Sequence, residues 1–318
     1  MKTLIKGLLA FLIVVGFSGG LLYAMKKGYF GEIDTSLDIS DPYTRGGFEV
    51  VNDGYLLDYW GDDDEIILPP TIKTISTNAF KGNKDIISIV IPETIEKIEP
   101  EAFSNCTKLE KVIIQANLSE LSYKTFYYCK SLTEIQLHDS IKKIGYSAFE
   151  GCQKLTNIIL PKKLEYIGGK AFNKCNLNTL IIPKTLTSVG KKGNKGPFSN
   201  CHATNIQLEE GMTKIPKNMF IRSDMKEIHI PSSITEIADS AFLECESLQK
   251  VTMEEGITKI GKYAFKDCKA LETIELPSTL TSCSNTMIKN CDDVTFIVKE
   301  DSYAHQFVLK NQFSYQLK

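Results

Sequence analysis

The chain has 318 residues, of which 42% are hydrophobic and 24% are charged, a composition typical of a folded protein. Its formal net charge is -2, with 37 Lys and Arg against 39 Asp and Glu, so no overall positive field would concentrate it on nucleic acid or an anionic membrane. We therefore expect no nucleic-acid partner.

Residues 1–27 have the features of a membrane-targeting segment. An uncharged run from Gly7 to Met25 is flanked by lysines on both sides. The run is long enough to cross the hydrocarbon core, which predicts an uncleaved signal anchor, but its most apolar part also suits a cleavable signal peptide. Either alternative places the rest of the chain outside the membrane, anchored in the first case and secreted in the second.

Residues 28–47 contain Gly, Asp, Ser and Pro without apolar periodicity, and we interpret them as a linker. Residues 48–65 contain two apolar stretches around Asp53-Gly54, a dipeptide typical of hairpin turns. We expect these residues to form two short strands that cap the N-terminal end of the following region.

Residues 66–298 repeat one pattern. A phenylalanine recurs at intervals of 23, 23, 23, 23, 26, 22 and 22 residues and then 23, and the last unit has Ile288 in its place. The column consists of Phe80, Phe103, Phe126, Phe149, Phe172, Phe198, Phe220, Phe242, Phe265 and Ile288. A second apolar column precedes it by five residues, and an L-x-x-I-x-L pattern that follows it predicts a short strand with alternating faces.

Such a unit is too small to fold alone, so neighbouring units have to bury one another's apolar edges. The sequence therefore predicts a repeat solenoid, mainly β with short helical turns, built from about ten stacked units of roughly 23 residues. Residues 299–318 are expected to form a C-terminal cap, in which Ser302 begins a helix over 303–309 and residues 313–317 return as a strand.

Eight cysteines stand three residues after the aligned phenylalanine or isoleucine, and only Cys283 lies elsewhere. A shared repeat position implies a shared buried environment, which predicts free thiols. Adjacent rungs are close enough for a disulfide, so pairing remains an alternative, although parallel side chains disfavour it. The clustered Cys and His spacings of a zinc site are absent, and we expect no metal.

No constellation of residues in the sequence predicts catalysis. The four histidines fall at unrelated repeat positions, and Cys201-His202 pairs a core cysteine with a surface histidine. The glycine-rich segment from Gly190 to Gly196 lacks the ending of a phosphate-binding loop, and Asp62 to Asp64 lack calcium-ligand spacing. We expect no cofactor and no enzymatic activity.

Two surfaces are candidates for binding. The first comprises the outward positions of the predicted strands, where β-branched residues form an apolar stripe in the first half of the repeats. Its candidate residues are Val90, Lys111, Ile113, Gln136, Ile159 and Ile181. The second is the insertion near residue 190, which breaks the period and contributes Lys191, Lys192 and Lys195. A solvated strand face and a variable loop are the corresponding non-functional interpretations.

The repeat pattern resembles the BspA-type leucine-rich repeats of cell-surface proteins over roughly residues 48–318. This resemblance implies an extracellular leucine-rich-repeat solenoid that adheres to a host or matrix protein, or to another cell, through a protein or glycan ligand. It provides no catalytic residues to transfer. The alternative is a structural or envelope-assembly scaffold that binds partners of its own cell.

Overall fold

The computed structural model describes residues 47–191, 193, 195–203 and 205–318. The expected signal segment, residues 1–27, lies outside the described residues, as does the expected linker except for Gly47. Among the described residues, no helix combines the length and the apolar character that crossing a membrane requires.

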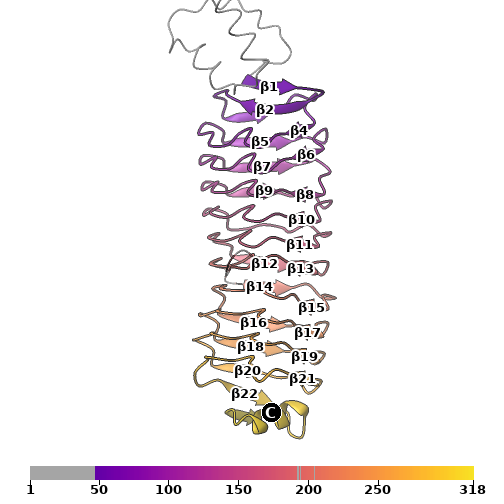
Figure 1. Ribbon diagram of the computed structural model, residues 1–318, viewed down its shortest axis with the longest axis vertical. Coiled ribbons are helices and arrows are strands. Elements are labelled where there is room, and N and C mark those ends of the chain that lie inside the picture. Colours follow the sequence, from indigo (N-terminus) through magenta and orange to yellow (C-terminus); the bar gives the residue numbers. More distant parts are fainter. Residues whose placement is uncertain (1–46, 192, 194, 204) are drawn as a thin grey trace, which may run out of the picture.

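The chain winds into an elongated solenoid whose rungs follow one another along the long axis (Figure 1). Each regular rung contains a long strand, a bend, a short strand and a run of turns, and these sides define a long-strand face, a short-strand face and a turn face. The long strands are β3 (Glu65–Ile67), β5 (Ser88–Ile91), β7 (Lys111–Ile114), β9 (Glu134–Gln136), β12 (Thr179–Ile182), β14 (Asn205–Leu208), β16 (Glu227–Ile230), β18 (Lys250–Met253), β20 (Thr273–Glu275) and β22 (Thr295–Val298). The short strands are β4 (Thr74–Ile75), β6 (Lys97–Ile98), β8 (Glu120–Leu121), β10 (Lys143–Ile144), β11 (Tyr166–Ile167), β13 (Ser188–Val189), β15 (Lys214–Ile215), β17 (Glu236–Ile237), β19 (Lys259–Ile260) and β21 (Ser282–Cys283).

Strands of successive rungs pair in parallel, and their register keeps equivalent residues in columns. On the long-strand face, Ile89 lies opposite Val112, which in turn lies opposite Ile135. All three side chains are buried because they point inward. The predicted repeat solenoid is confirmed.

The phenylalanine column forms the centre of the core. From Phe80 to Phe265 the rings stack one above another, with centroids 4.9 to 5.8 Å apart and nearly parallel planes in most pairs. All of these phenylalanines are at most 1% exposed. Each ring therefore buries the faces of its neighbours, and no rung in this stretch is stable independently of the next.

Eight cysteines form a second internal column, and these eight and Cys283 are all free thiols, as predicted. The Sγ of Cys106 donates to the carbonyl of Phe80 in the preceding rung at 3.0 Å, and Cys129 and Phe103 repeat this bond at 3.1 Å. Burial raises the pKa of Cys129, Cys152 and Cys175. The ladder is therefore structural and chemically inert.

The segments expected to form short helical turns are instead non-helical turns. Two residues per turn have left-handed backbone angles, such as Glu101 with φ 61° and Asn105 with φ 62°, which a helix does not accommodate. The freed N–H groups donate to the next rung, as Phe103 N does to Thr125 O at 3.0 Å. These turns therefore add a third line of contacts between rungs.

The long-strand face is interrupted in two places. Residues 157–160 form only a single bridge, between Asn157 and Thr179, and β14 and β16 belong to separate sheets. The second interruption follows the change in phenylalanine spacing from 26 to 22 residues. Neither break was predicted.

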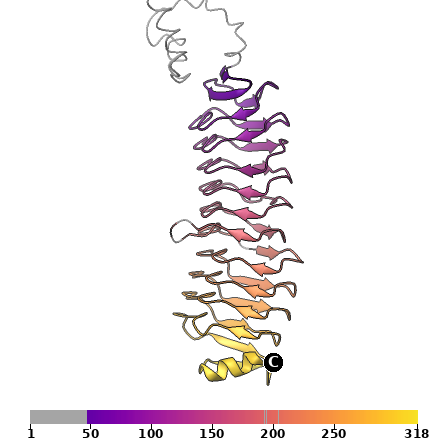
Figure 2. The same ribbon diagram turned by 45° about the vertical axis from the view of Figure 1, so that its right-hand side comes forward.

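Both ends are covered. At the N-terminal end, β1 (Phe48–Val51) and β2 (Tyr55–Tyr59) form the expected antiparallel pair. The tilted ring of Tyr59 packs against Phe80, 5.3 Å away between ring centroids. At the C-terminal end, Ser302 Oγ accepts a hydrogen bond from His305 N at 3.1 Å and caps α3 (Tyr303–Lys310). Helix α3 lies across the end of the solenoid (Figure 2), and β23 (Tyr315–Leu317) pairs with β22 as expected.

Candidate binding surfaces

The long-strand face presents two outward columns, and the first is largely apolar in the N-terminal half. Strand register places Ile67 beside Val90, Val90 beside Ile113, and Ile113 beside Gln136. Ile159 and Ile181 continue this outer column, because the bridge from Asn157 to Thr179 sets the same register. The structure thus gathers Val90, Lys111, Ile113, Gln136, Ile159 and Ile181 on one face.

The exposure of these side chains is unusual for isoleucine and valine. Ile159 is 85% exposed, Ile181 is 54% exposed and Val90 is 37% exposed, whereas Ile113 is half-buried between its neighbours. Ile67, also 85% exposed, belongs to the stripe but was not among the predicted residues. Ile67 directly follows the core residue Ile66, and because successive side chains of a strand point to opposite faces, this position indicates that Ile67 points outward.

The second outward column is polar and borders the apolar stripe. Lys111 Nζ lies 3.1 Å from Glu134 Oε1 on the next strand, and both side chains are well exposed. Such a pair contributes only about 0–1 kcal/mol to stability, so it is better understood as a polar rim than as a structural element.

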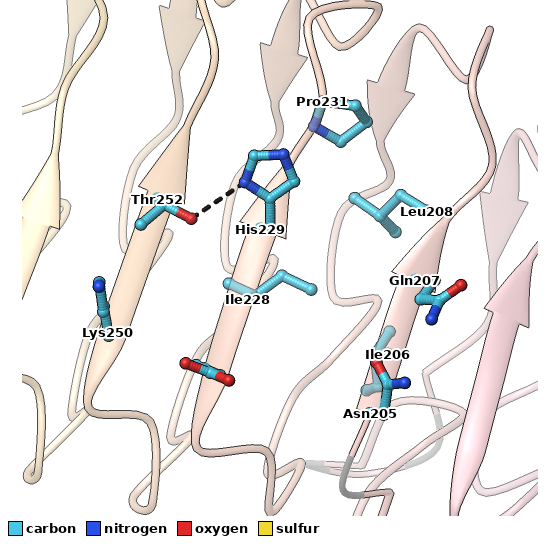
Figure 3. Close-up of a pocket in the computed structure, with 10 residues that line it drawn as sticks. Asn205, Ile206, Gln207, Leu208, Ile228, His229, Pro231, Lys250 and Thr252 are labelled. Atoms are coloured by element: carbon cyan, nitrogen blue, oxygen red, sulfur yellow. Dashed lines mark hydrogen bonds between the residues drawn. The ribbon is translucent and has the colours of Figure 1, made fainter.

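A hollow lined by both polar and apolar side chains lies at the sheet break between β14 and β16 (Figure 3). Its volume is about 380 Å³, and Gln207, His229 and Thr252 point from three successive long strands along it. His229 Nδ1 is 3.1 Å from Thr252 Oγ1, and its Nε2 is 3.1 Å from Glu254 Oε1. The hollow offers hydrogen-bonding groups to a polar ligand but contains no activated nucleophile.

The basic insertion lies away from the apolar stripe. It follows β13, so it joins the short-strand face to the turn face. Lys191 is exposed, Lys195 is partly buried with Nζ 3.4 Å from Asn173 Oδ1, and Lys192 lies outside the described residues. The eight predicted binding residues that the structure describes therefore do not form one site.

The side chains of Cys201 and His202 do not form a catalytic pair. Cys201 is fully buried, and burial raises its pKa to about 12. His202 is exposed, and its Nδ1 lies 2.8 Å from Asp224 Oδ2. Across the part of the chain that the structure describes, no three His, Cys, Asp or Glu side chains group closely enough to hold a metal ion.

Comparison with known proteins identifies the repeat. A family model described as the BspA type leucine-rich repeat region matches residues 73–196 and 192–316, with 6 copies. No curated protein matches the sequence.

Three solved structures of low sequence identity resemble the chain. One is a leucine-rich cell surface protein from Faecalibacterium prausnitzii, with 18% identity over 87% of this chain and 94% of that chain and a TM-score of 0.45. Another is the pneumococcal vaccine antigen PcpA, with 19% identity, 85% and 96% coverage and a TM-score of 0.48. The third is a leucine-rich repeat protein from Eubacterium ventriosum, with 23% identity, 73% and 64% coverage and a TM-score of 0.49.

Proposed function

Because the chain belongs to the BspA-type leucine-rich repeat family, we propose that it is a non-enzymatic binding protein of the cell surface. Its task is adhesion: it binds a host or matrix protein, or a protein on another cell, through the long-strand face. Residues 1–27 anchor it, or direct its secretion if they are cleaved.

The observation that supports this proposal best is the exposure of β-branched side chains in the outer column. Burying one isoleucine that is otherwise exposed contributes about 1.5–3 kcal/mol. Ile67, Val90, Ile159 and Ile181 together therefore provide enough apolar surface for an interface core. Lys111 and Glu134 border it as a polar rim that excludes water.

Strands β3, β5 and β12 also hold Ile67, Val90 and Ile181 of this surface in a fixed register. Each exposed side chain alternates with a buried one, so Val90 is fixed between the core residues Ile89 and Ile91. A partner binds such a surface without the entropic cost of ordering loops, so its affinity is higher than for an equivalent surface on flexible loops.

A location outside the cell is compatible with free cysteines only if the thiols resist oxidation. Seven of the nine are fully buried, and burial raises the pKa of most of them, so little reactive thiolate is present. The cysteine ladder therefore does not argue against an oxidising compartment.

The test is a capture experiment with the fragment of residues 48–318, which contains the whole hydrophobic core. Changing Ile113, Ile159 and Ile181 together to serine should reduce capture of the partner at least tenfold, because the apolar contact is lost. The free energy of unfolding should fall by less than about 1 kcal/mol, since two of the three side chains are largely exposed. Binding is measured against extracts of host matrix and, separately, of the protein's own cell envelope.

The matched control is Leu309→Ser, which removes a 46% exposed leucine from α3, away from the long-strand face. Its capture should equal that of the unchanged fragment. If the triple variant captured the partner as well as the unchanged fragment does, the long-strand face would not be the binding surface. Saturable binding only to the cell's own envelope would favour the scaffold alternative.

A further inference from the structure

The turn face carries a tyrosine in a backbone position that disfavours it. Tyr128 has φ 56°, in the left-handed region that costs a non-glycine residue roughly 1–2 kcal/mol. Neighbouring rungs have Gly82, Asn105 and Gly151 at the same position, which tolerate this conformation, whereas some later rungs have residues there that do not favour it, namely Lys174, Arg222 and Glu244. An aromatic side chain kept at a strained position motivates a search for its role.

The ring of Tyr128 lies over the next rung as a platform. A side chain at residue 151 would place its Cβ 2.8 Å from Tyr128 Cδ2, so the ring occupies the space that Gly151 leaves empty. The Tyr128 hydroxyl reaches one rung further, where Lys174 Nζ donates to it at 3.4 Å. The ring is only partly buried, which leaves a surface for a ligand to pack against.

Lysines surround this platform. Lys130 Nζ lies 5.8 Å and Lys174 Nζ lies 6.0 Å from the centroid of the Tyr128 ring, and both side chains are exposed. Lys195, from the insertion, reaches the same face through its contact with Asn173. Two cations from different rungs therefore lie within 6.0 Å of the centroid of one aromatic ring, and Lys195 lies near one of them, Lys174.

Carboxylates of the described residues neutralise some cations of the turn face, but they do not pair with these three lysines. Arg222 is paired with Glu244, Lys81 with Glu101, and Lys266 with Asp267. Among the residues that the structure describes, Lys130, Lys174 and Lys195 form no ion pair. The central rungs thus carry uncompensated positive charge on a protein whose formal net charge is -2.

The surroundings of Lys195 indicate the same imbalance. Partial burial lowers its pKa, and the charges of Lys170, Lys174 and Arg222 lower it further, while Glu150 partly opposes them. The Glu150 carboxylate is itself buried and accepts a hydrogen bond from Asn173 Nδ2 at 2.8 Å. An anion bound at the surface would relieve the repulsion that Lys195 experiences.

We propose that Tyr128, Lys130, Lys174 and Lys195 form a binding site for an acidic saccharide. The apolar face of one sugar ring packs on Tyr128, and carboxylate or sulfate groups on that ring and its neighbours accept charge-assisted hydrogen bonds from the lysines. This site lies on the turn face, so it is separate from the long-strand face proposed to bind protein.

The arrangement fits a sugar better than the other polyanions. Successive rungs are about 4.8 Å apart, so the site spans a few sugar units and no more. Nonspecific single-stranded nucleic acid binding uses a series of stacking rings along a basic groove. Here the neighbouring ring of Tyr127, 4.5 Å from Tyr128 between centroids, is tilted by 49° and does not continue such a stack.

The experiment uses the whole chain and two probes, a heparin-derived octasaccharide, which carries sulfates and carboxylates, and an oligogalacturonide, which carries carboxylates alone. Binding is measured by calorimetry at low and at physiological salt. Tyr128→Asn should weaken binding of the preferred probe roughly tenfold, while Tyr128→Phe should retain affinity within about twofold, because the ring and not the hydroxyl is required. Lys130→Gln combined with Lys174→Gln should weaken binding roughly tenfold and flatten its dependence on salt.

The choice of asparagine keeps the turn intact, since Asn105 occupies the same position one rung earlier. The matched control is Tyr263→Asn, which removes a 38% exposed tyrosine from the same face where Lys266 is already paired with Asp267. This control should leave affinity unchanged.

The proposal would be overturned if neither probe bound at low salt. It would also be overturned if Tyr128→Asn bound as tightly as the unchanged chain, or if Tyr128→Asn and the control lost the same amount of affinity. A single-stranded oligonucleotide that binds as tightly and is insensitive to Tyr128→Asn would indicate only a general polyanion contact. The triple isoleucine variant should bind the saccharide normally, which separates this proposal from the protein-binding one.

Discussion

Replacing Phe149 with alanine is expected to lower the free energy of unfolding by about 4 kcal/mol, the typical cost of deleting a buried aromatic ring. Phe149 is completely buried and stacks between Phe126 and Phe172, with ring centroids 5.6 and 5.3 Å away. The cavity would separate the two halves of the ladder, so loss of cooperativity between them is also expected. Urea denaturation followed by circular dichroism measures both effects.

Ile159→Ala is the matched control in the same rung, because its side chain is 85% exposed. Its effect should stay within about 0.5 kcal/mol. A loss of less than about 1 kcal/mol for Phe149→Ala would contradict the view that the phenylalanine column holds the rungs together.

Deleting residues 299–318 is expected to make the protein associate. The deletion removes Phe307, Val308 and Phe313, and Phe313 stacks on Phe296 at 5.3 Å between ring centroids. It also exposes the edge of β22, a row of unpaired backbone groups that invites pairing with a second chain. Size-exclusion chromatography with light scattering should detect oligomers or aggregate, and the melting temperature should fall.

A milder pair of variants separates packing from exposure of the edge. Phe307→Ala removes a side chain that is 6% exposed and should cost about 3–5 kcal/mol, whereas Leu309→Ala on the same helix should cost little. A truncated chain that remains monomeric and equally stable would show that residues 299–318 are not a cap.

Sequence periodicity was sufficient to predict the core. Phe103, Cys106 and Val112 each belong to a column in which every rung provides the same buried environment. The same residue type therefore recurs in each column, and this recurrence identifies the core positions in the sequence. The cap helix was also predictable, because Ser302 is a standard N-cap residue before an apolar segment.

The features that the sequence did not predict arise where rungs differ. The break between β14 and β16 depends on how a unit of 26 residues and one of 22 stack, which no single repeat contains. The left-handed backbone conformation of residues such as Tyr128 and Lys174 could not be predicted for a similar reason. The stacking of the turns requires a positive φ at these positions, although their side chains do not favour it.

The candidate surfaces were predictable only in part. Outward positions such as Ile159 follow from the alternation of a strand, and the structure places them on one face. The proximity of Lys195 to Lys174 and Asn173 was not predictable, since it depends on the path of the inserted residues. The sequence identified the insertion but gave no indication that it adjoins Lys174.

Hydrogen exchange of the whole chain with and without its captured protein partner tests the central claim most directly. We predict that amides of β5, β7 and β12, on the long-strand face, become more protected, because a bound partner slows their opening. Amides of the short strands β6, β8 and β10 should exchange as before. Protection confined to the short-strand or turn face would contradict the assignment of the long-strand face as the protein-binding surface.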